Sequence, residues 1–239
     1  METCLRGVVQ QRPPTQGNLV MAMTLYQSDL SPFAARVRIQ IRAKGIEGVA
    51  IEKAPGGTGS AEFRALNPTG KIPALLVDGV AIAESLTICD YLEDRFPEPP
   101  LWPTDLLARA HARTIARATD LYVCGPMFQT TGHASRKTRD EAFVAARMQD
   151  LKTGLAHIDA WRAAAGASGR YAVGDRLSLA DAALAPALFF VVNFAARVFG
   201  QDDLLSTAMT AYWQGIQEDA VVAPTLSAMD AALTAARGG

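Results

Sequence analysis

The chain has 239 residues, enough for one large domain or two modest ones with a substantial core. Apolar residues make up 49% and charged residues 20%, which is the balance of a globular protein and excludes a largely disordered one. The formal net charge is −1 and there is no long basic block, so we expect no nucleic-acid partner. We interpret the short basic clusters Arg36-Val37-Arg38 and Arg136-Lys137 as solvated helix or loop positions.

The first residues, 1–21, show neither a helical nor an alternating apolar pattern, so we expect a flexible tail. Gln10 and Gln11 end the only apolar stretch there, which argues against a signal peptide. We see no uninterrupted run of about 18 apolar residues and expect no membrane association. Cys4, Cys89 and Cys124 are scattered without a CxxC pair, which predicts neither a disulfide framework nor a metal site. Together these features predict a cytoplasmic protein.

Short elements alternate from residue 23 to residue 97. We predict strands at 23–27 and 49–51, helices at 32–44 and 61–66, a hairpin of 72–77 and 80–82, and a helix at 85–96. The dipeptide Asp78-Gly79 between two apolar runs is a strong hairpin signal. Cys89 falls on the apolar face of the last helix and is expected to be buried. The order β-α-β-α-β-β-α predicts a small mixed sheet with helices packed on it.

Proline-rich residues 98–103 predict a stiff linker between two regions of different character. Beyond the linker the chain is rich in alanine and reads as helical almost throughout. Candidate helices are 104–129, 138–166, 178–198, 203–217 and 224–237, and Pro126 and Pro186 are expected to kink two of them. Ser178 and Asp181 form a capping-box pattern, which we interpret as structural. We therefore predict a tail at 1–21, an α/β domain at 22–97, a linker at 98–103 and an all-α domain at 104–239.

Ser31 places a hydroxyl between the first predicted strand and the first turn of the helix that follows. Free backbone N–H groups and the positive end of the helix dipole favour an anion at such a place. Ser followed by Pro is also a common helix start, so a simple capping role is the alternative. Ser28, three residues earlier, is a competing hydroxyl for any anion-binding role.

Four segments in this order resemble the cytosolic glutathione transferases of the serine type. They are Ser31-Pro32-Phe33-Ala34-Ala35-Arg36-Val37-Arg38-Ile39, Asn67-Pro68-Thr69-Gly70-Lys71-Ile72-Pro73-Ala74-Leu75, Ala83-Glu84-Ser85-Leu86-Thr87-Ile88 and Val173-Gly174-Asp175-Arg176-Leu177-Ser178-Leu179-Ala180-Asp181. The resemblance implies a thioredoxin-like domain followed by an all-α helical domain. It also implies glutathione as co-substrate, a role in detoxification, a small hydrophobic electrophile as second substrate and a homodimer, with no metal or redox cofactor.

The resemblance also assigns roles to individual residues. Ser31 would be the catalytic residue, donating a hydrogen bond to the glutathione thiolate. Pro73 would follow a cis peptide bond that turns the backbone of Ile72 toward the ligand. Glu84 would take the γ-glutamyl ammonium and Ser85 the γ-glutamyl carboxylate. The full glutathione-binding set is Ser31, Phe33, Lys71, Ile72, Glu84 and Ser85. The second-substrate pocket would include Leu30, Tyr122, Met127 and Phe128, and Phe189, Phe190 and Phe194 are further candidates.

Two departures from the pattern leave alternatives open. The loop before the second predicted helix carries no cation for the glycyl carboxylate, so Lys53 or Lys71 could substitute. The Ser-Ser-Cys arrangement of zeta-type isomerases is absent, which weakens an assignment as maleylacetoacetate isomerase. Transferase activity is the main expectation. The alternatives are a glutathione-dependent isomerase or ether-cleaving enzyme of aromatic catabolism, and a ligand-binding member without turnover.

Overall fold

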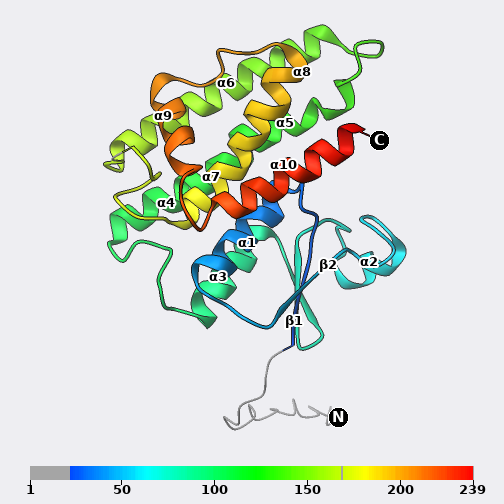
Figure 1. Cartoon of the computed structure of the whole chain (residues 1–239), viewed down its shortest axis with the longest axis vertical. Helices are drawn as coiled ribbons and strands as arrows, with labels where there is room; N and C mark the ends of the chain where they lie inside the picture. The colour runs from blue at the N-terminus through cyan, green and yellow to red at the C-terminus, as the bar shows by residue number, and fades with distance from the viewer. Residues whose placement is uncertain (1–21, 168, 239) are drawn as a thin grey trace, which may run out of the picture.

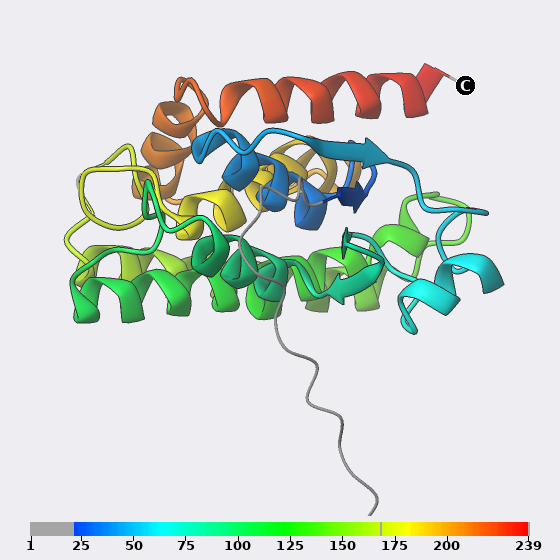
Figure 2. The same ribbon diagram turned by 90° about the horizontal axis from the view of Figure 1, so that it is seen from below.

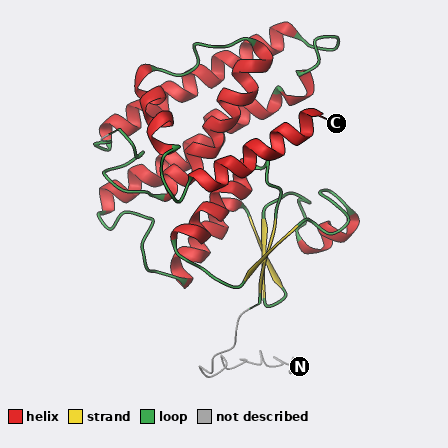
Figure 3. Ribbon diagram, in the orientation of Figure 1, coloured by secondary structure: helices red, strands yellow, loops and turns green. Residues whose placement is uncertain are grey.

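A computed structural model describes residues 22–167 and 169–238 (Figure 1). The predicted flexible tail and Cys4 lie outside the described residues. The four strands and their helices occupy one end of the molecule, and the remaining helices form the other (Figure 3). The predicted fold class, a small α/β unit followed by an all-α unit, is confirmed.

The sheet contains β1 (Met23–Tyr26), β2 (Val49–Glu52), β3 (Ala74–Val77) and β4 (Val80–Ala83) in the order β2-β1-β3-β4. β1 pairs parallel with β2 and antiparallel with β3, and the predicted hairpin joins β3 antiparallel to β4. Side chains alternate between the two faces of a strand. Leu25 and Leu75 therefore enter the main core, while Tyr26 and Ala74 contact a second cluster on the opposite face.

Helices cover both faces of this sheet. α1 (Pro32–Ala43) and α3 (Ser85–Arg95) pack against the main core, and α2 (Ala61–Leu66) lies on the other face through the buried Phe63. Phe63 meets Tyr26 edge-on with ring centroids 5.8 Å apart. The order of elements in this unit is the predicted one, with bounds that differ by one or two residues at the ends.

All of the regular secondary structure described in the second unit is helical. Its α-helices are α4 (Leu106–Ala118), α5 (Gly125–Gln129), α6 (Glu141–Ala164), α7 (Leu179–Phe190), α8 (Arg197–Phe199), α9 (Thr207–Ile216) and α10 (Ala223–Gly238), with a 3₁₀ turn η2 (Thr131–His133). In Figure 2, α10 runs along one side of the molecule, over α1 and β2, and α4 and α6 run along the opposite side.

Two of the predicted long helices contain π-helical segments. η1 (Thr119–Cys124) separates α4 from α5, and η3 (Val191–Ala196) separates α7 from α8. In η1 the N–H of Gly125 donates to the carbonyl of Asp120, five residues earlier, directly before Pro126. Because proline has no N–H, the regular α-helical pattern could not continue past this point unchanged. Such π-helical segments are frequent at functional sites.

α7 is the central helix of the molecule, and all of its residues are buried. By length and composition alone the stretch Leu179–Phe199 could cross a membrane, but most of it is buried inside the fold. It was not recognised from the sequence because Asp181 and Asn193 interrupt its apolar run. Its burial against α1, α4 and α9 is that of a core helix.

The linker is fastened to the α/β unit by a buried ion pair. Lys44 pairs with Glu93, and its Nζ also donates to the carbonyls of Phe96 (2.7 Å) and Pro99 (2.8 Å). The other oxygen of Glu93 accepts from the backbone N–H groups of Leu101 and Trp102, at 2.9 and 3.0 Å. These bonds occupy the carbonyl of Phe96, the C-cap of α3, and tie residues 99, 101 and 102 of the linker to the α/β unit.

Candidate functional site

Ser31 is the N-cap of α1, so the capping role considered from the sequence is realised in the geometry. Its backbone is extended (φ −81°, ψ 120°), and its Oγ accepts a hydrogen bond from the N–H of Ala34 at 3.2 Å. Within the described residues no group accepts a bond from the Ser31 hydroxyl, so its hydrogen remains available. Because capping uses only the oxygen lone pair, it leaves Ser31 able to donate to an anion.

A second donor lies beside this hydroxyl. The N–H of Phe33 is in the first turn of α1, where helix N–H groups have no intrahelical partner. Nothing in the described part of the chain accepts a hydrogen bond from it. Pro32 brings no N–H of its own. The start of α1 therefore offers a hydroxyl, one free N–H and the positive end of a 12-residue helix.

The peptide bond between Ile72 and Pro73 is cis, as the resemblance predicted. The N–H and C=O of Ile72 have no hydrogen-bond partner among the residues that the structure covers. Unpaired backbone groups of a half-buried residue are available to an extended peptide, as in the addition of a strand to a sheet edge. Ile72 also lines two separate cavities.

The first of these, here called the α5-side cleft, has a volume of about 460 Å³. It lies between the two units and is lined by Phe33, Thr58, Gly70, Lys71, Ile72, Asp120, Cys124, Gly125 and Phe128. The rings of Phe33 and Phe128 are 5.8 Å apart at its apolar wall. Its size falls within the range of small-molecule sites, about 300–1,000 Å³.

The second, here called the α10-side cavity, has a volume of about 430 Å³. Its lining residues are Gln27, Ser28, Asp29, Lys53, Ala54, Gly57, Thr58, Ile72 and Ala232. Ser28 and Ser31 are thus placed differently, since Ser28 is exposed in this cavity and Ser31 caps α1. The two candidate cations are also divided, with Lys53 in this cavity and Lys71 in the α5-side cleft.

Glu84 and Ser85 form the start of α3. Glu84 is exposed with φ at 65°, and its side chain makes no capping bond to the helix. Ser85 is buried, and its Oγ accepts a hydrogen bond from Arg36 at 3.1 Å, which leaves its own hydrogen free. An uncapped helix start with a guanidinium beside it is suited to a carboxylate.

Arg36 of α1 contacts both Ser85, at the start of α3, and Asp120 of η1. Its guanidinium makes two hydrogen bonds to Asp120 of η1, at 2.5 and 3.0 Å, besides the bond to Ser85. Only 1% of its side chain is exposed. Burial opposes its charge, but the bonds and the attraction from Asp120 leave the pKa of Arg36 raised above its usual value. The interpretation of Arg36 as a solvated residue was wrong.

The two buried cysteines are unsuited to act as nucleophiles. Burial raises the pKa of both Cys89 and Cys124 to about 12, so both remain thiols at neutral pH. Cys124 lines the α5-side cleft but is only 1% exposed. The burial of Cys89 was predicted and is confirmed. A neutral, enclosed thiol behaves as a small apolar group.

The structure brings together some of the second-substrate candidates and separates others. Phe128 lines the α5-side cleft, whereas Met127 is fully buried and Leu30 packs against the core. Tyr122 lies in another surface cavity, where its ring contacts His157 and Trp161. Phe190 contacts Phe128 with centroids 5.5 Å apart, behind the cleft. Phe189 and Phe194 belong to the helical core and its edge.

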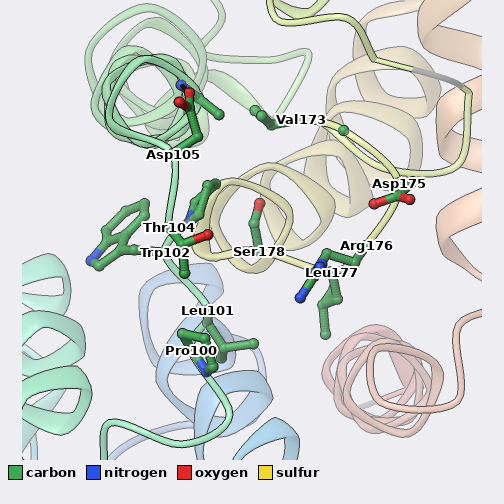
Figure 4. Close-up of a pocket in the computed structure, with 13 residues that line it drawn as sticks. Pro100, Leu101, Trp102, Thr104, Asp105, Val173, Asp175, Arg176, Leu177 and Ser178 are labelled. Carbon is green, nitrogen blue, oxygen red and sulfur yellow. Dashed lines mark hydrogen bonds between the residues drawn. The ribbon is translucent and has the colours of Figure 1, made fainter.

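A further small cavity lies away from this region, between the linker and the loop before α7 (Figure 4). Trp102 and Asp105 come from the linker side, and Val173 and Ser178 come from the loop. The capping box of Ser178 and Asp181 next to it is present as predicted. Asp181 is fully buried and accepts bonds from Ala172, Ser178 and Tyr212, which agrees with a structural role.

Sequence reasoning missed Arg36, Asp120 and Ala232 as parts of this region. Arg36 and Asp120 are separated by 84 positions, and nothing local to either residue indicates the pairing. Arg36 shares a helix face with Pro32 and Gln40, four residues to either side, and the structure buries all three. Ala232 carries no chemical signal of its own and enters only because α10 lies over β2.

Comparison with known proteins gives a consistent result. Residues 25–100 match the family model of the glutathione S-transferase N-terminal domain, and residues 141–212 match that of the C-terminal domain. The chain is 32% identical over 194 residues to glutathione S-transferase 1 of Dianthus caryophyllus, covering 80% of this chain and 86% of that protein. It is 33% identical over 166 residues to maleylacetoacetate isomerase of Rattus norvegicus, covering 68% and 74%.

Solved structures show the same fold. A glutathione S-transferase from Methylobacterium radiotolerans, crystallised with glutathione sulfonate, superimposes with a TM-score of 0.69 at 24% identity, covering 85% of this chain and 94% of that one.

Proposed function

The chain belongs to the glutathione transferase superfamily, and from this premise we propose that it joins the sulfur of glutathione to a hydrophobic electrophile. Glutathione is the co-substrate of this superfamily, whose members similar to this chain include both transferases and isomerases. The observation that carries the proposal is Ser31, a helix cap whose hydroxyl hydrogen has no acceptor among the described residues.

When bound, glutathione supplies the nucleophilic sulfur. A free thiol has a pKa near 8.5, so only a few per cent is ionised at neutral pH. Ser31 donates its hydroxyl hydrogen to the sulfur, and the N–H of Phe33 and the dipole of α1 favour the same negative charge. Each unit by which the thiol pKa falls corresponds to about 1.4 kcal/mol of preferential binding of the thiolate.

The remaining contacts hold the tripeptide in one orientation. Ile72 offers its free N–H and C=O to the cysteinyl backbone of the ligand. Glu84 accepts from the γ-glutamyl ammonium, and Ser85 with the start of α3 takes the γ-glutamyl carboxylate. Lys53 and Lys71 line the cavities on either side of Ile72, and one of them holds the glycyl carboxylate.

The electrophile is assigned to the α5-side cleft. Phe33 and Phe128 give it an apolar wall, and Phe33 follows two residues after Ser31. An electrophile that fills this cleft displaces water from it and so strengthens the hydrogen bonds donated to the sulfur. The homodimer and the role in detoxification that the resemblance implies, and the cytoplasmic location predicted from the sequence, belong to this proposal.

A glutathione-dependent isomerase is the second candidate, favoured by the 33% identity to maleylacetoacetate isomerase. The same residues would position glutathione for both reactions. Product analysis separates them, because conjugation consumes the free thiol in proportion to product and isomerisation returns it. A protein that binds glutathione without turning over either class of substrate would be a ligand-binding member.

Replacing Ser31 tests the proposal. We expect Ser31→Ala to lower turnover with a reactive electrophile at least about tenfold, because a donor to a developing anion is lost. Ser28→Ala is the matched control, since it removes a hydroxyl from the neighbouring cavity and should leave turnover within about twofold. Circular dichroism checks that both variants fold. A loss of activity in Ser28→Ala with full activity in Ser31→Ala would transfer the role to Ser28.

A further inference from the structure

A cavity of about 340 Å³ opens between α7, η3, α9 and α10, outside the proposed glutathione site. We call it the α9–α10 cavity. Its lining residues are Phe189, Asn193, Trp213, Gln217, Ala223, Leu226, Ser227 and Asp230. It shares no residue with either cavity beside Ile72. Asn193 comes from the π-helical segment η3, a type of irregularity that often marks a functional site.

The polar groups of this cavity include hydrogen-bond acceptors that remain available. The Nδ2 of Asn193 donates to the carbonyl of Phe189 at 3.0 Å, and the Nε2 of Gln217 donates to the carbonyl of Trp213 at 2.9 Å. Each amide thus uses one of its two N–H groups on the backbone. Its oxygen, which accepts through two lone pairs, has no partner among the described residues.

Asp230 is the one charged residue of the lining in the part of the chain that the structure describes. Its carboxylate makes no ion pair or hydrogen bond within residues 22–167 and 169–238. The guanidinium of Arg237, on the same helix, donates to the backbone carbonyl of Asn193 at 2.6 Å and forms no ion pair with Asp230 among the described residues. A carboxylate and two carboxamides among the lining residues of one cavity can accept hydrogen bonds from a ligand with several N–H donors and a positive charge.

The rest of the lining is apolar. Trp213, Phe189 and Leu226 are nearly buried and form the floor of the cavity, while Ser227 and Asp230 are exposed at its rim. On α10, residues 223, 226, 227 and 230 follow helical spacing and share one face. The charged end of a ligand would therefore lie at the mouth and its apolar body against the aromatic floor.

We propose that the α9–α10 cavity binds a small primary amine in its ammonium form, with an aromatic or aliphatic body of modest size. The ammonium donates to Asp230 and to the amide oxygens of Gln217 and Asn193, and the body covers Trp213. This site does not depend on glutathione, because α10 separates it from the cavity that contains Lys53 and Ala232.

Calorimetric titration of the full chain with phenethylamine, in the presence of saturating S-methyl glutathione, tests the proposal. We expect saturable binding that Asp230→Asn weakens at least about tenfold, because the charged acceptor is lost. Hydrocinnamate, of similar shape but negatively charged, should show no saturable binding. Ser227→Phe, which fills the rim with an aromatic ring, should also abolish binding of the amine.

Asp202→Asn is the matched control, since it neutralises an exposed carboxylate of the same unit outside the cavity. It should bind phenethylamine as the unmodified chain does. The proposal is overturned if no saturable binding occurs, if Asp230→Asn binds unchanged, or if hydrocinnamate binds as tightly. Binding of phenethylamine that occurs without S-methyl glutathione but is lost in its presence would also overturn it, because the amine would then occupy the glutathione site.

Discussion

At the scale of single residues, Glu84 has an unusual backbone. Its φ of 65° lies in a region that glycine adopts freely and other residues adopt at a cost of about 1–3 kcal/mol. The same residue carries the carboxylate proposed to hold the γ-glutamyl ammonium. A residue in a strained conformation beside a candidate binding site suggests that binding, rather than stability, accounts for the glutamate there.

Comparing Glu84→Gly with Glu84→Ala separates these two contributions. Both variants lose the carboxylate, so we expect each to bind glutathione about tenfold more weakly. Only glycine relieves the backbone, so Glu84→Gly should have a free energy of unfolding about 1 kcal/mol higher than Glu84→Ala. Calorimetry and denaturant titration measure the two quantities. An alanine variant as stable as the glycine variant would show that the backbone at 84 is unstrained.

Asp181 illustrates a buried carboxyl group whose environment opposes its charge. Complete burial raises its pKa to about 6 from the usual 3.8, although the hydrogen bonds from Ala172, Ser178 and Tyr212 lower it. The folded protein therefore holds the proton more tightly than the unfolded chain does. The contribution of Asp181 to the free energy of unfolding must fall as the pH rises through about 6.

This sign can be measured against a variant that does not titrate. The free energy of unfolding of Asp181→Asn, subtracted from that of the unmodified chain, should give a difference that grows as the pH is lowered from about 7 to about 4. Denaturant titrations across that range supply both curves. A difference that is constant with pH, or that shrinks on acidification, would mean that Asp181 keeps an ordinary or lowered pKa in the fold.

At the scale of elements, α6 and η1 pack unusually closely. A Cβ added at Gly154 of α6 would lie 2.1 Å from the carbonyl oxygen of Tyr122 and 2.7 Å from its carbonyl carbon. The contact is with backbone, which cannot rotate aside as a side chain could. Gly154 therefore allows α6 to approach the segment that carries Asp120 and Cys124 into the α5-side cleft.

We expect Gly154→Ala to lower the free energy of unfolding by about 1–3 kcal/mol, even though alanine has the higher helix propensity. Gly132→Ala is the control, because a Cβ there meets no atom within 4 Å. Thermal or denaturant unfolding of both variants is the measurement. An alanine at 154 that leaves stability unchanged or raises it would show that the two segments separate without cost.

The elements themselves were largely predictable, because apolar periodicity and turn residues are local signals. The order of strands and helices, the hairpin at Asp78-Gly79 and the capping box at Ser178 all follow from neighbouring residues. The π-helical segments η1 and η3 were missed, since their apolar spacing hardly differs from that of an α-helix. The burial of Arg36 was missed because it depends on Asp120, 84 positions away.

The site could be predicted only in part for the same reason. The cis bond before Pro73 was expected from the resemblance, and the structure contains it. The roles of Ser31, Glu84 and Ser85 remain predictions, and the division of the two serines and the two lysines between separate cavities depends on tertiary structure. No pattern in the sequence indicated that Ala232 of α10 would line a cavity with Ser28 and Lys53.

At the scale of the whole molecule, one hydrophobic core extends through both units. Leu25 and Ile88 of the α/β unit belong to the same cluster as Ile115 and Leu184 of the helical unit. We propose that the predicted boundaries at 97 and 104 mark a change of architecture, and that the two units on either side are not independently stable. The α5-side cleft lies where the units meet, so the position of Asp120 against Arg36 depends on both.

The central claim is that the start of α1, with Ser31 as its donor, keeps the sulfur of bound glutathione ionised at neutral pH. Ultraviolet absorbance of the thiolate, followed as the pH is varied with glutathione bound to the unmodified chain and to Ser31→Ala, tests it most directly. We predict an apparent pKa for the bound thiol at least about one unit below 8.5 in the unmodified chain, and a return toward 8.5 in the variant. A bound thiol that titrates near 8.5 in both proteins would contradict the account.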